Sequence, residues 1–345
     1  MSNSLPLVEL ETAAKDVMDP LAFAYVSGGA GQESCLNRSR SAWGRIYLKP
    51  KPMSSLLGFS TQVQFAAVDL SFPCLIAPMA YQKLATQDGE RASHMAALAQ
   101  GAGYVLSCQT SVRPSELGSG PFWFQLYLQP DPKVTVALIQ SALSAGATAV
   151  VVTIDAPVNG IRNREAAVQF TLPSDIRPVM FEGHGMPART IEELAAMAPT
   201  WAELEQICRH SPVPVYAKGI MTAEAAKRVI DCGCAGLIVS NHGGRVLDGL
   251  PATAVVLPSI RRAVPEATLL VDGGIRTGED IFRAIALGAN AVLVGRPVFY
   301  ALALDGALGV STCLRRLRDE FAATMALCGA SRVADINGDY LYWNE

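Results

Sequence analysis

The stretch TLLVDGGIRTGEDIFRAIALGANAVLVGRPV, residues 268–298, decides the fold class of this chain. It joins an apolar run (268–275), a helical pattern (278–288) and a second apolar run (291–298). Near-continuous apolar runs are typical of parallel strands that are buried on both faces. A threonine precedes the helical pattern and a glycine ends it, as helix caps prefer. The stretch therefore predicts a strand–helix–strand unit.

The same alternation continues outward from this unit over most of the chain. Six more apolar runs lie at 72–80, 103–110, 121–128, 149–156, 213–220 and 236–243. Helical patterns follow several of them, at 89–101, 132–146 and 222–233. Eight alternations of strand and helix predict an α/β protein folded as a (β/α)8 TIM barrel.

Two segments fall outside this repeat. Residues 1–70 carry an acidic helix-like start, a Gly-rich turn and basic sequence, which predict an N-terminal extension packed on the barrel. Residues 157–200 separate the fourth and fifth strands and show little periodicity before residue 188. Because long barrel loops of this kind are usually functional, we expect a lid-like insertion after strand four. We expect both segments to belong with the barrel to one domain, residues 1–345.

Composition narrows the function class. Of the 345 residues, 50% are hydrophobic, and 28 basic against 31 acidic residues give a formal net charge of −3. Such a balance lacks the basic footprint of a nucleic-acid-binding protein. The N-terminus lacks the basic and apolar regions of a signal peptide, and no run of about 18 uninterrupted apolar residues predicts a membrane span. We therefore expect a cytoplasmic protein without a membrane partner.

The eight cysteines are expected to stay reduced in that compartment. Cys232 and Cys234 form the one close pair in the sequence. Without a second Cys/His pair, their C-x-C spacing predicts no metal site. We interpret the cysteines as structural or incidental thiols.

Polar residues gather at the carboxyl ends of the predicted strands, where barrel enzymes have their active sites. Packing alone does not explain them, because a buried polar group without a partner is costly. In chain order they are Tyr127, Thr153, Asp155, Lys218, Ser240, His242, Arg245, Asp272, Arg276 and Arg296.

The loops after strands seven and eight predict a phosphate site. Gly273, Gly274 and Gly295 allow the backbone to approach an anion, and Arg276 and Arg296 add charge-assisted hydrogen bonds. This is the frequent phosphate position in such barrels. The glycines by themselves would also suit tight turns.

The other strand-end side chains suit acid–base and carboxylate chemistry. His242 suits a base that works near neutral pH, and Asp155 would orient it and stabilise the imidazolium. Arg162 and Arg245 would bind a small carboxylate, although Arg162 is equally consistent with a solvated loop charge. Lys218 is either a Schiff-base nucleophile or a fixed positive charge that faces a cofactor.

The segment SNHGGRVLDG, residues 240–249, resembles the signature of the FMN-dependent α-hydroxy-acid oxidases and dehydrogenases. This family includes glycolate oxidase, lactate oxidase and mandelate dehydrogenase. Segments 77–85, 124–127, 153–165 and 271–303 resemble it as well. The resemblance implies oxidation of an L-2-hydroxy acid to the 2-oxo acid, with a hydride equivalent passing to N5 of FMN and O2 then giving H2O2. It also implies a homotetramer or octamer.

The resemblance implies a role for each matched residue. His242 would be the catalytic base, Asp155 its partner and Tyr127 a hydrogen-bonding partner of the substrate hydroxyl. Tyr25, Arg162 and Arg245 would hold the substrate carboxylate. The flavin ring would lie against Ala77, Pro78, Met79, Ala80, Ser107, Gln125, Thr153, Lys218 and Ser240, and the ribityl phosphate against Asp272, Gly273, Gly274, Arg276, Gly295 and Arg296.

The chain departs from the family pattern at several positions. Gln109 stands where short-chain oxidases carry tryptophan, which predicts a more polar substrate pocket and argues against glycolate. Met79 stands where threonine is common near the flavin. Ala80 favours simple oxidase behaviour over that of the monooxygenase branch. The segment 166–200 is shorter than in glycolate oxidase, so we expect a more open site.

Three alternatives stay open at this stage. A dehydrogenase would pass its electrons to a quinone or another acceptor, but the mixed charge of 157–200 argues against a membrane-bound form. A non-oxidase FMN barrel, such as an isomerase, would not need the predicted carboxylate-binding arginines. A non-catalytic flavin-binding protein would lack some of the site residues.

Overall fold

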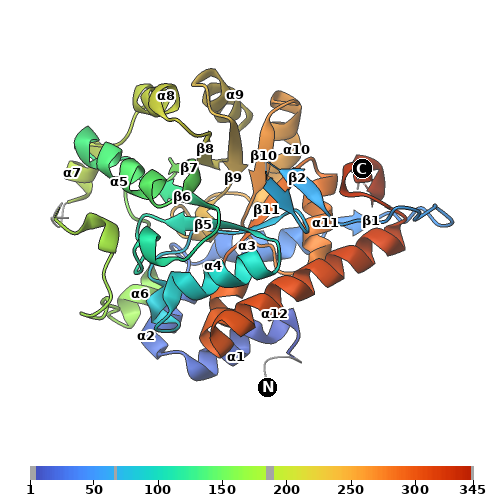
Figure 1. The fold of residues 1–345 in the computed structure, drawn as a ribbon, viewed down its shortest axis with the longest axis horizontal. Coiled ribbons are helices and arrows are strands. Elements are labelled where there is room, and N and C mark those ends of the chain that lie inside the picture. The colour runs from blue at the N-terminus through green and yellow to red at the C-terminus, as the bar shows by residue number, and fades with distance from the viewer. Residues whose placement is uncertain (1–4, 66–67, 184–189, 343–345) are drawn as a thin grey trace.

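The computed structural model describes residues 5–65, 68–183 and 190–342. Eight parallel strands form a closed barrel in the order β10-β11-β4-β5-β6-β7-β8-β9, with helices around it (Figure 1). The strands are β4 (Cys74–Ile76), β5 (Gly103–Ser107), β6 (Phe122–Leu126), β7 (Ala147–Thr153), β8 (Val215–Ile220), β9 (Gly236–Val239), β10 (Thr268–Val271) and β11 (Ala291–Val294). Each coincides with one of the eight apolar runs, so the predicted barrel is confirmed.

Seven of the strands end earlier than the apolar runs that predicted them. Strand β9, for example, ends at Val239, whereas the run continues to Gly243. The remaining residues of these seven runs lie at the carboxyl end of the barrel, mostly in loops, and residues 296–298 begin α12 (Arg296–Cys328). The predicted polar residues therefore lie mostly in these loops, on a rim fixed by the strands below.

The barrel interior is a packed apolar core. Because successive side chains in a strand face opposite sides, alternate residues of each strand point inward. Trp123 stacks on Tyr216 with ring centroids 4.4 Å apart. A hairpin of β2 (Val63–Phe65) and β3 (Val68–Leu70) closes one end, where Phe65 stacks on Trp123 at 5.8 Å. The sequence did not predict this hairpin.

Helices form the outer layer, and a second apolar core lies between them and the strands. They are α4 (Gly89–Ala99), α5 (Pro132–Ser144), α8 (Trp201–His210), α9 (Ala223–Asp231), α10 (Thr253–Ala263), α11 (Gly278–Ala286) and α12 (Arg296–Cys328). The helix α12 is long and apolar enough by composition to cross a membrane, but it bends at Asp305 and Gly306, and 61% of its most apolar window is buried. Packing on α4, α11 and α1 accounts for that composition.

The N-terminal segment packs on the barrel as predicted. It contains α1 (Leu10–Val17), α2 (Pro20–Ser27) and α3 (Ser34–Gly44), and its β1 (Tyr47–Leu48) pairs with β12 (Leu341–Tyr342) near the other end of the chain. Trp43 of α3 donates from Nε1 to the carbonyl oxygen of Gly273 at 2.8 Å. Gly274 has a φ of +85°, and a Cβ there would lie 1.9 Å from the Ser39 carbonyl oxygen. Only glycine allows α3 this close to the loop after β10.

The segment between β7 and α8 is more regular than its sequence suggested. It contains α6 (Asn163–Ala167), the short 3-10 helix η5 (Val179–Phe181) and α7 (Ile191–Ala196). A capping box joins Thr190 and Glu193 at the start of α7. Residues 184–189 of the predicted lid loop lie outside the described residues.

Candidate active site

A cavity of about 480 Å³ opens at the carboxyl ends of the barrel strands. Its volume lies in the range of pockets that hold small molecules and cofactors. Every site residue predicted from the sequence lines this cavity except Asp155 and Ser240. Those two residues are hydrogen-bonded to His242 and Lys218, which do line it. The structure therefore brings the whole predicted set together.

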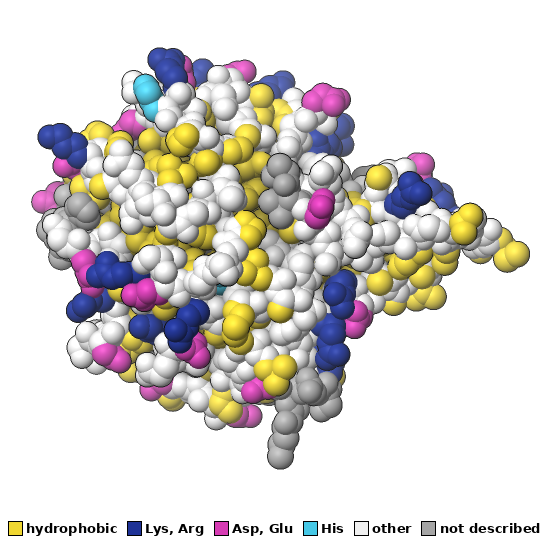
Figure 2. Space-filling model, in the orientation of Figure 1, with side chains coloured by type: hydrophobic (Ala, Val, Ile, Leu, Met, Phe, Trp, Pro, Cys, Tyr) yellow, Lys and Arg dark blue, Asp and Glu magenta, His cyan; other side chains and the backbone are white. Residues whose placement is uncertain are grey.

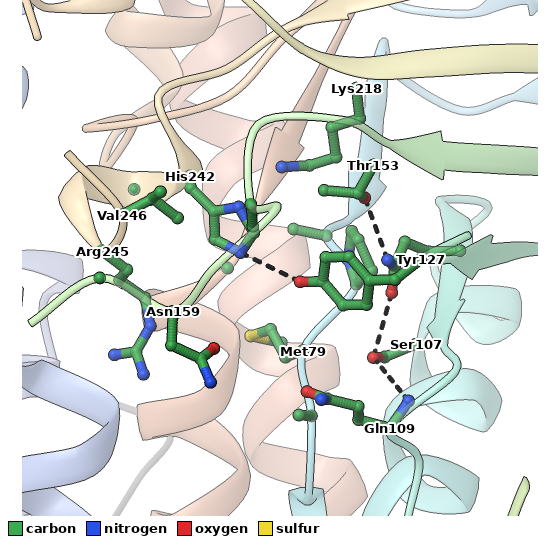
Figure 3. A pocket seen from close by; sticks show the side chains of 18 of the residues that line it. Met79, Ser107, Gln109, Tyr127, Thr153, Asn159, Lys218, His242, Arg245 and Val246 are labelled. Carbon is green, nitrogen blue, oxygen red and sulfur yellow. Dashed lines mark hydrogen bonds between the residues drawn. The ribbon is translucent and has the colours of Figure 1, made fainter. Parts of the chain in front are cut away.

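His242 sits between a carboxylate and a phenol. Its Nδ1 lies 2.9 Å from Oδ1 of Asp155, and its Nε2 lies 3.3 Å from the hydroxyl of Tyr127 (Figure 3). A carboxylate accepts hydrogen bonds only, so in the neutral imidazole Nδ1 carries the proton and donates it to Asp155. Nε2 is then an acceptor that faces the cavity. This arrangement suits proton abstraction by Nε2.

The backbone near His242 and Asp155 has positive φ angles at two positions, His242 itself and Gly219. His242 lies in the left-handed region with a φ of +56°, in the turn after β9. Non-glycine residues in this region carry strain, which often marks a functional site. Gly219 has a φ of +107°, and a Cβ there would lie 2.5 Å from Cβ of Asp155. Glycine at 219 leaves the room that Asp155 needs to reach His242.

The surroundings keep Asp155 ionised. Burial raises the pKa of its carboxyl, but the nearby His242 and Lys218 outweigh burial, and the pKa ends below the usual 3.8. Burial raises the pKa of the Tyr127 hydroxyl well above its usual value, so this group stays protonated. Asp155 is therefore a fixed anion, and Tyr127 a neutral donor to Nε2.

A chain of polar side chains crosses the strand ends on the other side of the cavity. Ser107 donates to Oε1 of Gln125 at 3.2 Å, and Gln125 donates from Nε2 to Thr153 at 3.0 Å (Figure 3). Lys218 is 5% exposed, and its Nζ lies 2.8 Å from the Ser240 hydroxyl and 2.9 Å from Oδ2 of Asp272. Lys218 is therefore half of a buried ion pair with Asp272, held in place by Ser240 as well.

Two partly buried arginines follow β10 and β11, Arg276 in a loop and Arg296 at the start of α12. Arg276 donates from Nη1 to the Ile275 carbonyl oxygen at 3.0 Å, while its buried Nε has no hydrogen-bond partner in the described parts of the chain. Arg296 donates instead to the carbonyl oxygens of Val26, Gly28 and Gly243. Burial lowers the pKa of both, for Arg296 to about 9. Of the two, Arg276 has the donor that is free for an anion.

Two further arginines share one carboxylate. Arg162 and Arg245 lie 3.2 Å and 3.1 Å from the same oxygen of Glu165. Arg245 also donates to the Tyr25 and Gly28 carbonyl oxygens at 2.6 Å and 3.0 Å, and lies over the Tyr25 ring at 4.9 Å. The two guanidinium groups thus meet on one wall of the cavity, as a carboxylate site requires.

Polar and apolar residues form the opening. Figure 3 shows the amide side chains of Gln109 and Asn159 directed into the space on either side of Met79. From the segment between β7 and α8, Phe181, Leu194 and Met197 line the same cavity. This segment therefore contributes to the wall of the cavity.

Sequence reasoning missed Glu165, the shared partner of Arg162 and Arg245. Its position three residues after Arg162 on a short helix was the available signal. It also missed Asn159, Val246 and the apolar lid residues, because no local pattern marks them as neighbours of the barrel rim.

The cavity fits FMN by its own chemistry. An anion would satisfy the buried Nε of Arg276, and Gly274 and Gly295 line the cavity beside it. The buried cation Lys218 and the chain Ser107–Gln125–Thr153 offer donors and a positive charge to a polar ring system. Arg276 and the two glycines would hold the phosphate of bound FMN. Lys218 and the polar chain would hold its ring.

The fold and the site define a flavin-dependent (β/α)8-barrel oxidoreductase. The family profile described as FMN-dependent dehydrogenase matches residues 14–343. An L-lactate oxidase of Roseobacter sp. (strain GAI101) is 47% identical over 96% of this chain and 93% of its own. The 4-hydroxymandelate oxidase of Amycolatopsis orientalis is 38% identical over 95% of each chain. A solved structure of mandelate oxidase with (S)-4-hydroxymandelic acid gives a TM-score of 0.91 at 37% identity, over 97% of this chain and 98% of that one.

The chain belongs to the family of FMN-dependent α-hydroxy-acid oxidases, and it is an FMN-dependent 2-hydroxy-acid oxidase. The predicted family, cofactor and enzyme class are confirmed. The roles of single residues stay predictions.

Proposed function

We propose that this enzyme oxidises a small L-2-hydroxy acid to its 2-oxo acid and passes the electrons to O2, which gives H2O2. One observation carries the proposal. His242 is fixed by Asp155 at Nδ1, so that Nε2 faces the cavity within reach of Tyr127. This is the arrangement of an oriented base beside a hydroxyl donor.

His242 takes the proton of the substrate hydroxyl at Nε2. The imidazolium that forms lies against the ionised Asp155, whose carboxylate stabilises the new charge. Tyr127 keeps its proton and donates a hydrogen bond to the substrate oxygen, which holds that oxygen near Nε2. Such base catalysis contributes about 10²–10⁴-fold in rate.

Arg162 and Arg245 bind the substrate carboxylate and so set the orientation of the reacting carbon. Glu165 holds the two guanidinium groups together. FMN, when bound, supplies the two-electron acceptor. Lys218, held by Asp272, would bind the ring and offset negative charge there.

Two features of the opening bear on the substrate side chain. Gln109 and Asn159 make part of the wall polar, whereas Leu194 and Met197 of the lid segment make another part apolar. The relatives named L-lactate oxidase and 4-hydroxymandelate oxidase span a small and a large side chain. We propose L-lactate first, because the L-lactate oxidase relative shares the higher identity, and aryl-substituted acids second.

The test is a product balance under air with a panel of L-2-hydroxy acids. We expect equal amounts of 2-oxo acid and H2O2 from the preferred acid, and none from its D-enantiomer. The His242→Asn variant, loaded with FMN, should lose about 10²–10⁴-fold in kcat. Formation of 2-oxo acid only in the presence of a quinone, without H2O2, would overturn the oxidase proposal.

We also propose that the enzyme is a homo-oligomer, a tetramer or octamer. Figure 2 shows hydrophobic side chains on the projection at the right of the view, which is the chain between β1 and β2. There Met53 and Leu57 are 102% and 89% exposed. Because monomers rarely present such apolar projections to water, a second copy is the expected cover. Light scattering of the protein and of Leu57→Asp tests this, since the variant should shift to smaller species.

A further inference from the structure

Two cysteines far apart in the sequence meet on the outside of the barrel. Sγ of Cys208, near the end of α8, lies 3.3 Å from Sγ of Cys234, in the loop between α9 and β9. Cys208 is half-buried and Cys234 is buried. Neither residue lines the active-site cavity.

The third cysteine of this region, Cys232, is not part of the close pair. Cys232 is two residues from Cys234, yet its Sγ lies 3.8 Å from the carbonyl oxygen of Trp201 at the start of α8. The close pair is therefore set by tertiary packing and not by the C-x-C spacing. Cys232 offers a matched control in the same loop.

The geometry of the pair is close to that of a bond. A disulfide has its sulfur atoms about 2.05 Å apart, so Cys208 and Cys234 must approach by about 1.2 Å from their present 3.3 Å. Cys208 lies near a helix end and Cys234 in a loop, positions where the backbone can move by that amount.

The two thiols also differ in character. The hydrogen bond with Cys234 lowers the pKa of the Cys208 thiol despite its partial burial. The same hydrogen bond and burial raise the pKa of Cys234. Because the thiolate is the nucleophile and Cys208 is also the more exposed, Cys208 is the first to react with a small oxidant.

We propose that Cys208 and Cys234 form a peroxide-reactive dithiol that closes to a disulfide. The Cys208 thiolate attacks one oxygen of H2O2, the O–O bond breaks, and hydroxide leaves with a sulfenic acid on Cys208. Cys234 then attacks this sulfur, the S–O bond breaks, and water leaves as the disulfide forms. The proton that Cys208 released neutralises the hydroxide.

This inference rests on the proposed function for its oxidant, since H2O2 is the product of that reaction. The bond would join α8, which directly follows the lid helix α7, to the strand β9 that leads to His242. The oxidised enzyme should therefore have a higher Tm than the reduced enzyme, and a reductant should reverse the change.

The experiment treats the reduced holoenzyme with H2O2 in the absence of any hydroxy acid. We expect a mass lower by about 2 Da, because disulfide formation removes two hydrogen atoms, and a peptide that links residues 208 and 234. Cys208→Ser and Cys234→Ser should abolish the link, and Cys232→Ser should retain it. Linkage of another cysteine pair, or a gain of oxygen mass in place of the link, would overturn the proposal.

A second arm separates this inference from the proposed function. The reduced holoenzyme turns over its hydroxy acid under air, with and without catalase. Formation of the 208–234 link in turnover, suppressed by catalase, supports both proposals. A link that forms with added H2O2 while turnover yields no H2O2 supports the dithiol and contradicts the oxidase proposal.

Discussion

At the scale of single residues, the chemistry depends on how Asp155 and His242 hold each other. The pKa of Asp155 is lowered in the folded protein, so its ionised form contributes stability above the unfolded value of 3.8. That contribution is lost as the pH falls through the lower folded pKa. The ionised carboxylate also fixes the tautomer that leaves Nε2 as the acceptor.

Replacing Asp155 by Asn should therefore have two effects. We expect kcat to fall by about 10²–10⁴-fold, because the imidazolium loses its counter-charge. The stability difference between wild type and Asp155→Asn should be largest above pH 4 and should shrink below it. Urea unfolding across this pH range measures it. An unfolding difference that grows on acidification would contradict the assignment of Asp155 as the fixed anion.

Glu165 governs how the two arginines are presented. Among the described residues, the Arg245 side chain contacts Glu165 and also donates to two backbone carbonyl oxygens. The Arg162 side chain has only Glu165 there as a hydrogen-bonding or ionic partner. Removing the carboxylate should mainly release Arg162.

For Glu165→Ala we expect KM to rise by about 10-fold or more with kcat changed much less, because a carboxylate clamp contributes mainly uniform binding. Glu165→Gln keeps an acceptor oxygen and should show the smaller rise. Steady-state kinetics with the preferred acid measure both. Equal losses of kcat and kcat/KM in Glu165→Ala would instead indicate a role in the transition state.

At the scale of elements, the small helix α7 determines how the lid meets the cavity. Its Leu194 lines the cavity, and the capping box of Thr190 and Glu193 secures its first turn. Loss of such a cap costs about 1 kcal/mol locally. A helix of six residues has little else to stabilise it on its own.

Thr190→Ala should raise KM a few-fold with little change in Tm, because α7 frays without unfolding the barrel. A matched cap lies on α9, where Thr222 accepts from the backbone of Ala225 at 3.2 Å, away from the cavity. Thr222→Ala should leave KM unchanged. Steady-state kinetics and limited proteolysis of both variants test this prediction. An equal rise of KM in both would show that α7 has no specific effect on substrate binding.

The sequence predicted the long strands and helices better than it predicted short elements. Runs such as 268–275 and 291–298 are apolar because their strands are buried on both faces, and this pattern is local. The pairing of β1 with β12 and the β2–β3 hairpin involve two or three residues per strand, too few for a pattern. The short helices α6 and η5 were missed because no long apolar stripe marks them.

The site was predictable in its residue types and less so in its contacts. Polar groups after apolar strands indicated His242, Asp155 and Lys218 directly. The sharing of Glu165 by two arginines and the meeting of Cys208 with Cys234 depend on tertiary packing, which leaves no signature in either segment. Neither could be predicted from the order of residues alone.

At the scale of the whole molecule, the N-terminal segment completes the cofactor end of the site. Ser39 and Trp43 of α3 meet Gly274 and Gly273 in the loop after β10. We propose that the extension and barrel therefore unfold as one unit, although 230 or more residues separate these contacts in the chain.

Gly274→Ala tests this dependence. The added Cβ would meet the Ser39 carbonyl oxygen at 1.9 Å in a left-handed backbone, so we expect a loss of about 3 kcal/mol or more and weaker FMN binding. Gly288 is also left-handed, but its Cβ would meet side-chain atoms of Arg261, the nearest at 2.7 Å, and no backbone atom of α3. Gly288→Ala should cost less and leave FMN affinity unchanged. Chemical unfolding measures the stability of both variants, and fluorescence titration measures their FMN affinity. Unchanged FMN affinity in Gly274→Ala would show that the packing of α3 does not support the cofactor site.

The most direct test of the account is the visible spectrum of the FMN-loaded protein during anaerobic addition of L-2-hydroxy acids. The account predicts that the flavin absorbance bleaches with L-lactate or a related acid, and that it returns at once when air is admitted. It also predicts that the His242→Asn variant binds FMN normally but bleaches far more slowly. A fully loaded enzyme that no L-2-hydroxy acid bleaches would contradict the central claim.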